Sequence, residues 1–419
     1  MHTGYRDVLS IRRYRWLWLG DTASSLGDSV SFVALVWLVY ETSGSSSTVG
    51  WFVAAYTAPV LIGGPFVGAV LDRFDRRRLL IADNVFRAGL MALVPILQLA
   101  GALRLWQLYV VAVVYGLLKM FPLAGVPALI PDLVPDDRLE VANALETVSY
   151  FLSAVVGAAM AGVLVAAVGG ANALWFDAAS YMFFAFALWR MGRVPSAHET
   201  AGDGVGPSIR TAARFVVATP VIVATTVMFM LVNVGEGILQ VVMPVYVRGV
   251  LGAGPGTYGA LVSVAAAAGV LGALAAGVSA GRLRLGKAIA VSEILAGVAF
   301  AALGGTPGTG LAFLLFALGS LFLGPLTVWA QTIRMRFIPA DMRGRVFGLL
   351  RTLMQSTVPL GALLASLLLA RGGMATALLA VGLLLVLPAV VALTLGLLRQ
   401  DRPGDADVRA DQTAAASCP

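Results

Sequence analysis

The sequence predicts an all-α membrane protein, with twelve transmembrane helices in two pseudo-symmetric six-helix bundles. Of the 419 residues, 59% are hydrophobic and only 12% are charged, whereas soluble domains have roughly 25% charged residues. The apolar residues form long continuous segments, which excludes the alternating strands of a membrane β-barrel. The two halves of the chain also share short motifs at an offset of about 208 residues, as expected of a duplicated bundle.

Twelve apolar segments are long enough to cross a bilayer, which takes about 20 residues of helix. They cover residues 16–40, 49–71, 79–101, 105–128, 141–168, 172–192, 219–247, 255–280, 288–305, 309–333, 345–370 and 374–398. The first segment carries Asp21 and Asp28 and lacks a small-residue cleavage site. It is therefore expected to be a transmembrane helix and not a signal peptide. The remaining residues are too few for a soluble catalytic domain, so an enzyme is not expected.

The longest polar stretch between apolar segments lies near the middle of the chain, at residues 193–214. It divides the twelve segments into two groups of six. The expected organisation is an N-terminal bundle at 1–192, a cytoplasmic central loop at 193–214, a C-terminal bundle at 215–398 and a disordered cytoplasmic tail at 399–419. The tail is charged and rich in alanine, a composition that cannot bury a core.

Loops on alternate sides of the predicted bundle differ in positive charge. One side carries 23 of the lysine and arginine residues and the other carries 3, while Arg87, Lys119 and Arg351 fall inside apolar segments. Because cytoplasmic loops carry the excess of positive charge, both termini are expected in the cytoplasm of a multi-pass protein of the bacterial inner membrane. These loops also account for the net charge of +7, so nucleic acid is not an expected partner.

Residues that bind metals or form disulfides are scarce. The single cysteine, Cys418, lies in the C-terminal tail, and the two histidines, His2 and His198, lie in polar segments. No internal disulfide and no cysteine metal site can form. No metal or other cofactor is expected, and proton chemistry inside the membrane must use carboxyl groups.

Three short motifs recur in the same order in the two halves. The matched pairs are Leu26–Asp28 with Val234–Glu236, Gly68 and Asp72–Arg73 with Gly277 and Gly281–Arg282, and Val134–Asp137 with Ile338–Asp341. Duplicated bundles are typical of secondary transporters, in which the substrate site lies between the repeats near the middle of the membrane. A channel or a membrane enzyme needs no such repeat.

The loop after the second segment carries a motif, G-A-V-L-D-R-F-D-R-R-R, at residues 68–78. It resembles the signature loop of the major facilitator superfamily, with Asp75 at a position where glycine is usual. The variant D-R-F-D-R-R looks most like the drug:proton antiporter branch that includes macrolide and siderophore exporters. The residues that match the motif are Gly68, Asp72, Arg73, Arg76 and Arg77.

The resemblance extends over nearly the whole chain and implies transport by alternating access. It implies that the motif closes the cytoplasmic side when the transporter faces outward. Arg351, about two turns into the eleventh segment, is expected to reach the gate around Asp72. The alternative for the arginines of the loop is that they only set the topology.

Ionisable residues deep in a membrane are costly and indicate function. Asp28 lies near the middle of the first segment, and its repeat mate Glu236 lies in the seventh. In the family these two helices line the central cavity, so both acids are candidates for proton coupling or substrate contact. The alternative is that each only forms a hydrogen bond to a neighbouring helix. Asp21 is a further candidate, although a loop arginine is an equally plausible partner for it. Lys119 either extends toward the cytoplasm or pairs with an acid.

Structural roles are favoured for the remaining acids. Asn143 and Glu146 have the spacing of a capping box, and Asp177 lies near the start of its helix, where negative charge is favoured. Asp83 and Arg87 are four residues apart and can pair. Glu293, the approximate repeat mate of Asp83, lies close to the cytoplasmic end of its segment.

The sequence thus predicts a monomeric secondary transporter that exports amphipathic or hydrophobic small molecules, drugs or natural products, in exchange for protons. Its partners are the substrate, protons and the lipid bilayer. One alternative is a dedicated siderophore or natural-product exporter, and another is a lysolipid flippase on the same fold. A membrane-embedded enzyme is disfavoured, because no nucleophile elbow or phosphate loop is present.

Overall fold

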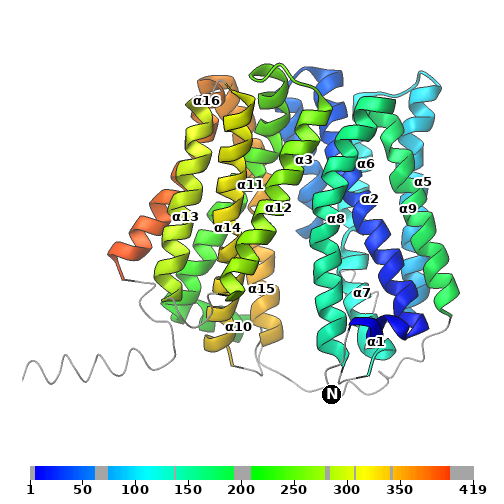
Figure 1. Ribbon diagram of the computed structural model, residues 1–419, viewed down its shortest axis with the longest axis horizontal. Coiled ribbons are helices and arrows are strands. Elements are labelled where there is room, and N and C mark those ends of the chain that lie inside the picture. The colour runs from blue at the N-terminus through cyan, green and yellow to red at the C-terminus, as the bar shows by residue number, and fades with distance from the viewer. Residues whose placement is uncertain are drawn as a thin grey trace, which may run out of the picture. The chain divides into compact units, whose positions relative to one another are not determined.

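The computed structural model describes residues 5–61, 74–135, 138–192, 209–278, 284–305, 308–339 and 343–396. These residues are almost entirely helical, and none of them forms a β-strand. The helices are shown in Figure 1. They are α1 (Tyr5–Ser10), α2 (Arg12–Ser43), α3 (Ser46–Thr57), α5 (Arg76–Leu99), α6 (Leu105–Leu118), α7 (Met120–Leu133), α8 (Leu139–Val168), α9 (Gly170–Met191), α10 (Ile209–Ala218), α11 (Pro220–Gly249), α12 (Pro255–Val278), α13 (Leu285–Ala302), the short 3-10 helix η2 (Leu303–Gly305), α14 (Thr309–Phe337), α15 (Arg343–Gln355) and α16 (Val358–Thr394).

The all-α membrane fold predicted from the sequence is confirmed. Within the described ranges, nine helical stretches are long and apolar enough to cross a bilayer. The longest, Val346–Thr394, has 49 residues, which is more than twice the length that one crossing needs. This stretch accommodates the last two predicted crossings, so the nine stretches account for ten of the twelve. The helices α3 and α9 lie in the other two predicted segments, and the described helices are therefore consistent with twelve crossings.

The predicted segment 105–128 is not one helix, because α6 ends at Leu118 and α7 begins at Met120. Pro122 lies in the first turn of α7. Proline has no backbone N–H. It is tolerated in the first turn of a helix because the N–H groups of that turn have no acceptor within the helix. The break between α6 and α7 therefore lies just before Pro122.

The last two predicted segments meet at a glycine inside α16. Gly373 has φ 72° and ψ −170°, a backbone conformation that residues with a Cβ rarely adopt. The chain also breaks between α15 and α16, where Pro359 occupies the first turn of α16. The break at Gly373 thus lies in the gap predicted between residues 345–370 and 374–398, whereas the break between α15 and α16 divides the predicted segment 345–370 at a position that the hydrophobic pattern did not predict.

The chain forms two compact units, residues Met1–Gly202, Gln240–Ala266 and Ala365–Leu367 in unit 1 and the remainder in unit 2. In unit 1, α2 packs along α9 and α8, and α5 packs along α9. In unit 2, α13 packs along α14, and α10 contacts α15. The last residues of the predicted central loop thus begin a helix, α10, while residues 193–208 lie outside the described chain.

The packing within the units follows the internal repeat. A Cβ at Gly27 of α2 would meet α9, and one at Gly235 of α11 would meet Val381 and Leu385 of α16. The first helix of each half therefore packs against the last through a glycine at the repeat offset. A second pair has the same form, because Gly157 of α8 approaches α2 and Gly361 of α16 approaches α11. Small residues permit this close approach of helices in a membrane.

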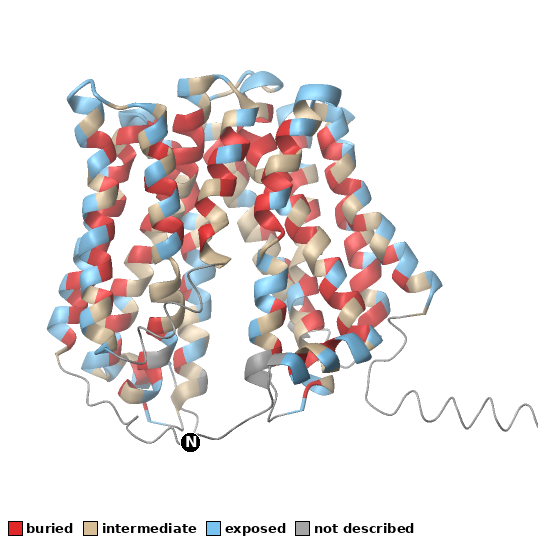
Figure 2. Ribbon diagram, turned by 180° about the vertical axis from the view of Figure 1, so that it is seen from behind, coloured by how far each residue is buried: buried red, intermediate tan, exposed pale blue. Residues whose placement is uncertain are grey.

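Individual helices carry one buried face and one exposed face, as Figure 2 shows. Many of the exposed side chains are large and apolar, among them Trp51, Leu99, Trp106, Leu271 and Leu314. Water would disfavour so much exposed apolar surface on a soluble protein. A surrounding of lipid explains it.

Candidate functional site

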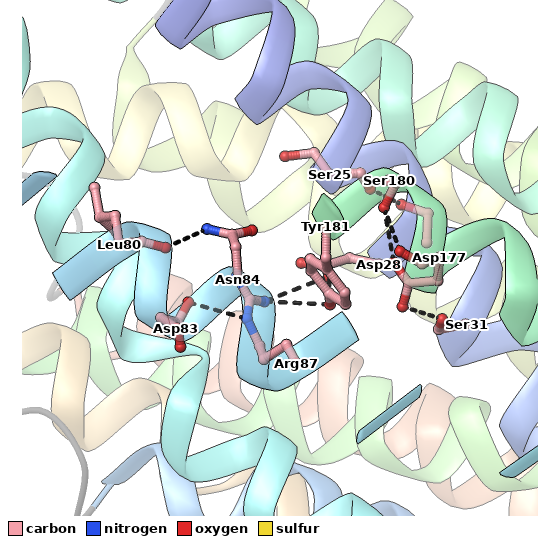
Figure 3. A network of polar contacts seen from close by, with 11 residues as sticks. Ser25, Asp28, Ser31, Leu80, Asp83, Asn84, Arg87, Asp177, Ser180 and Tyr181 are labelled. Carbon is pink, nitrogen blue, oxygen red and sulfur yellow. Dashed lines mark hydrogen bonds and ion pairs between the residues drawn. The ribbon is translucent and has the colours of Figure 1, made fainter. Parts of the chain in front are cut away.

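Polar side chains from three neighbouring helices of unit 1 meet around one arginine, Arg87 of α5 (Figure 3). Its side chain is completely buried. The guanidinium Nε lies 3.1 Å from Oδ2 of Asp83, one turn earlier on the same helix. The pairing of Asp83 with Arg87 that the sequence predicted is confirmed. A guanidinium at full burial needs such a partner, because desolvation of an unpaired charge is costly.

Arg87 also connects α5 to α9 and α2. Its Nη1 donates a hydrogen bond of 3.2 Å to the hydroxyl of Tyr181, and the Tyr181 hydroxyl donates to Oδ1 of Asp28. Nη1 lies 3.7 Å from the same Asp28 oxygen. The guanidinium carbon lies 4.3 Å from the centre of the Tyr181 ring, within the range of a cation–π contact. Asp28 is the least buried member of this set, with its side chain 24% exposed.

A third carboxyl group, that of Asp177 on α9, lies beside this set and accepts hydrogen bonds from hydroxyl groups. Ser31 of α2 donates to Oδ2 of Asp177, and Ser180 donates to Oδ1 over 3.1 Å. A Cβ at Gly27 would collide with the Asp177 carboxyl and the Ser180 hydroxyl. Glycine at position 27 thus provides the space in which these two side chains lie.

This arrangement corrects the structural role expected for Asp177. The helix α9 begins at Gly170, so Asp177 lies two turns inside it, where the helix dipole has little effect. Its side chain is fully buried. Hydroxyl donors from α2 and α9 stabilise it instead of the helix N-terminus.

Charges in this region are unbalanced. The carboxyl groups of Asp28 and Asp83 contact the guanidinium of Arg87, and the carboxyl group of Asp177 lies in the same polar region (Figure 3). If all three acids were ionised, one positive charge would face three negative charges away from bulk water. Like charges at short distance in a low-dielectric site repel strongly. The set can lower its net charge by binding protons, which is the chemistry required of a coupling site.

A separate pair of acids lies nearer the start of α2. The carboxyl groups of Asp21 and Glu146 lie within hydrogen-bonding reach of each other, and Tyr14 is close to Glu146. The Tyr14 hydroxyl donates to the carbonyl of Ala142 over 2.9 Å. The neighbour of Asp21 is therefore Glu146 of α8. From the sequence, a loop arginine was an equally plausible partner. The capping box expected at Asn143 and Glu146 is wrong, because α8 begins at Leu139.

Of the motif predicted to form the cytoplasmic gate, Gly68, Asp72 and Arg73 lie outside the described residues. The arginines that follow are described. Arg77 donates to the carbonyls of Leu188 and Trp189, at 2.7 and 2.9 Å, and so satisfies acceptors at the end of α9.

Two other members of the motif loop hold the start of α5. Arg76 lies 3.9 Å from the carboxylate of Asp132 on α7. Asp75, at the position where the motif it resembles usually has glycine, accepts a 2.9 Å hydrogen bond from the backbone N–H of Arg78. Asp75 thus caps the N-terminus of α5, and its φ of −57° requires no glycine.

The other residues that the sequence predicted for the site, Glu236, Arg351 and Lys119, are not part of the cluster around Arg87. Glu236 is exposed on α11 in unit 2, and Arg351 is exposed on α15 in the same unit. Lys119 lies at the junction of α6 and α7, with its Nζ 5.8 Å from the centre of the Tyr56 ring. Tyr56 itself stacks on Tyr115, with ring centres 4.6 Å apart. The structure thus brings Asp28 together with Arg87 and places Lys119 beside an aromatic side chain.

Sequence reasoning did not select Tyr181, Ser31 or Ser180. A signal was present, because Asp177, Ser180 and Tyr181 are spaced at intervals of three and four residues in an otherwise apolar segment. Residues with this spacing share one face of a helix. A polar face inside a membrane segment points toward other protein and not toward lipid.

Comparison with known proteins finds a transmembrane family and relatives that are named as transporters. A family model described as "Transmembrane secretion effector" matches residues 7–413. The multidrug efflux pump Tap of Mycolicibacterium fortuitum is 28% identical over 384 residues, which cover 89% of this chain and 93% of that protein. The uncharacterised MFS-type transporter y4rN of Sinorhizobium fredii is 31% identical over 405 residues, which cover 93% of this chain and 96% of that protein.

A solved structure with the same fold is that of a bacterial homologue of the human lysosomal transporter Spinster, in an inward-facing and occupied conformation. It superposes with a TM-score of 0.75 at 15% sequence identity, over 97% of this chain and all of that one. At this level of identity the likeness shows the fold alone.

Proposed function

The chain belongs to the transmembrane secretion effector family of the major facilitator superfamily, and we propose that this transporter exports amphipathic or hydrophobic small molecules in exchange for protons. One observation supports proton exchange above the others. Two acids, Asp28 and Asp83, contact the guanidinium of Arg87 inside helices that cross the membrane, and a third buried acid, Asp177, lies on the neighbouring helix α9. Ionisable residues at such depth are retained where they have a task.

Asp28 is the proposed entry point for the proton, because it is the most exposed acid of the set. When ionised, it attracts the Arg87 guanidinium at 3.7 Å and accepts the hydrogen bond of Tyr181. A proton on Asp28 removes the charge that attracts Arg87. Protonation therefore loosens a connection between α2, α5 and α9. A proton that binds one state more tightly than the other shifts the transporter toward that state.

The substrate class rests on the relatives and on the lack of a polar sugar-binding set in the sequence. A relative of 28% identity is named a multidrug efflux pump. The motif from Gly68 to Arg77 is proposed as the gate of the cytoplasmic side. The contacts of Arg76 and Arg77 with α7 and α9 support that role, since they join the ends of three helices. We place the transporter in the bacterial inner membrane, as a monomer with both termini in the cytoplasm.

Proton exchange is tested by measuring proton release from the purified protein in weakly buffered detergent solution. A panel of lipophilic drugs and natural products is added, and binding of each compound is measured in parallel. Wild type is compared with Asp28→Asn. A matched control is Asp7→Asn, which makes the same change on the exposed helix α1.

We expect compounds that bind to release protons from wild type and the control, but not from Asp28→Asn. Unchanged release from Asp28→Asn would move coupling to another acid, with Asp21 and Glu146 next to be tested. Binding without release from wild type would contradict proton exchange and favour a facilitator or a lysolipid flippase. Release by one compound alone would favour a dedicated siderophore or natural-product exporter.

A further inference from the structure

An apolar pocket of about 670 Å³ lies between α12, α13 and α14 in unit 2. Ligand pockets in proteins have volumes of about 300–1,000 Å³. These three helices run side by side in Figure 1. A Cβ at Gly272 of α12 would collide with the backbone of Leu321 on α14, so these two helices are in close contact there. Ser292 of α13 donates a hydrogen bond to the carbonyl of Phe322 and joins α13 to α14.

Two positive charges lie at one end of this pocket. Arg284 immediately precedes α13, and Lys287 lies in its first turn; both line the pocket and both are exposed. Within the described part of the chain, neither cation forms an ion pair or a side-chain hydrogen bond. The acid of the same helix, Glu293, is not among the lining residues. The two charges are therefore available to an anion.

The other walls are apolar and open to the surface of the unit. Val291 and Leu295 line the pocket on α13 and are 51% and 43% exposed. From Arg284 to Leu295 the helix rises by about 16 Å at 1.5 Å per residue. This length matches one leaflet of the hydrocarbon core, which is about 15 Å. Trp329 of α14 also lines the pocket, and its buried indole N–H has no acceptor within the described ranges of the chain.

We propose that this pocket binds an acidic phospholipid of the cytoplasmic leaflet. The anionic headgroup lies against Arg284 and Lys287, and one acyl chain runs along Val291 toward Leu295. The charged end of the pocket belongs to the side that carries the basic loops, where acidic lipids attract lysine and arginine. The ligand is a lipid and not a free anion, because the greater part of the pocket is apolar.

The proposal is tested by native mass spectrometry of the delipidated protein. Phosphatidylglycerol and phosphatidylcholine with identical acyl chains are titrated separately. The charge variant is the double substitution Arg284→Gln and Lys287→Gln. Its matched control is Arg12→Gln and Arg13→Gln, which removes two exposed positive charges from unit 1 on the same predicted side of the membrane.

We expect one tight phosphatidylglycerol adduct in wild type and in the control. The charge variant should bind about 25-fold more weakly, because each cation near an anionic lipid contributes roughly a factor of five. Equal binding of phosphatidylcholine to wild type would overturn the proposal. So would an equal loss of binding in the control, or displacement of the lipid by millimolar inorganic phosphate, which would show that the site takes a free anion.

A second variant tests the apolar part of the pocket. Ala275 of α12 lines the pocket and is exposed, so Ala275→Phe fills the space without entering the core. Its control is Leu274→Phe, at the neighbouring exposed residue, which is not part of the lining. We expect weaker phosphatidylglycerol binding in Ala275→Phe only. Unchanged binding in this variant would show that the lipid is held elsewhere.

Discussion

Arg87 contributes to stability as well as to the proposed coupling, because its side chain is fully buried against Asp83, Asp28 and Tyr181. Removing one partner of a buried ion pair leaves an uncompensated charge and typically costs 3–5 kcal/mol. We therefore predict that Arg87→Gln lowers the free energy of unfolding by about 3 kcal/mol and abolishes substrate-induced proton release. Thermal unfolding in detergent and the proton-release assay measure the two effects.

The control for Arg87→Gln is Arg78→Gln, on the exposed start of the same helix. It should change neither the unfolding temperature nor proton release. The double variant Arg87→Gln with Asp83→Asn should recover part of the lost stability, because it no longer leaves Asp83 without its cation. Equal unfolding temperatures for Arg87→Gln and Arg78→Gln would contradict the stabilising role of the buried pair.

Gly27 is predicted to be essential to the position of Asp177. In Gly27→Ala the new Cβ would collide with the Asp177 carboxyl and the Ser180 hydroxyl. We expect transport activity to fall at least tenfold, since a displacement of about 1 Å in a preorganised site has an effect of this size. Drug efflux from cells expressing each variant is the measurement. Gly89→Ala is the control, because a Cβ at Gly89 of α5 meets no atom within 4 Å; equal loss in both variants would contradict the prediction.

Some residues of the site could be predicted from the sequence, and others could not. Asp83 and Arg87 pair within one helix, so their spacing is sufficient to predict the contact. Asp28 was selected by its depth in an apolar segment. The partner of Asp177 is Ser31, 146 positions away, and the neighbour of Asp21 is Glu146. Such contacts depend on which faces of two helices meet, and one sequence without relatives does not contain that information.

At the scale of helices, the sequence predicted apolar length better than helix ends. The thickness of the bilayer sets the minimum length of an apolar segment that crosses it. The helices α2, α5, α8 and α14 are long enough, as predicted. The break between α6 and α7 depends on Pro122, which the apolar pattern ignores. The short helix α10 was assigned to a loop, because its apolar residues are too few to indicate a membrane segment.

The interruption of α16 at Gly373 gives a prediction at this scale. Its φ of 72° with ψ −170° is a left-handed conformation adopted almost only by glycine, where a residue with a Cβ costs roughly 1–3 kcal/mol. We expect Gly373→Ala to lower the free energy of unfolding by about that amount, measured by thermal or denaturant unfolding in detergent. Gly348→Ala is the comparison, because Gly348 has no left-handed φ and a Cβ there meets no atom within 4 Å. Equal stability of the two variants would contradict the left-handed conformation of Gly373.

At the scale of the whole molecule, the two halves share helix packing but not charge. Gly27 and Gly235 lie at the contacts of equivalent helix pairs. The charges differ: in α5, Arg87 follows Asp83 by one turn, whereas in α13 the residue one turn after Glu293 is Gly297. Glu293 is fully buried, and neither of its carboxyl oxygens has a hydrogen-bond partner among the residues that the structure describes. Among the described residues, both halves therefore share this packing, while the cluster of acids around a buried arginine is found in the first half.

The predicted topology can be tested with the one native cysteine. Cys418 belongs to the C-terminal tail, which the excess of basic loops assigns to the cytoplasm. In spheroplasts, a membrane-impermeant maleimide should not label Cys418, and it should label it once the membrane is permeabilised. The matched probe is Ala102→Cys in a Cys418→Ser background. Ala102 is exposed between α5 and α6, in a loop expected on the periplasmic side, so intact spheroplasts should be labelled. Labelling of Cys418 from outside would contradict an even number of crossings with a cytoplasmic N-terminus, and it would place the cations of the proposed lipid site in the opposite leaflet.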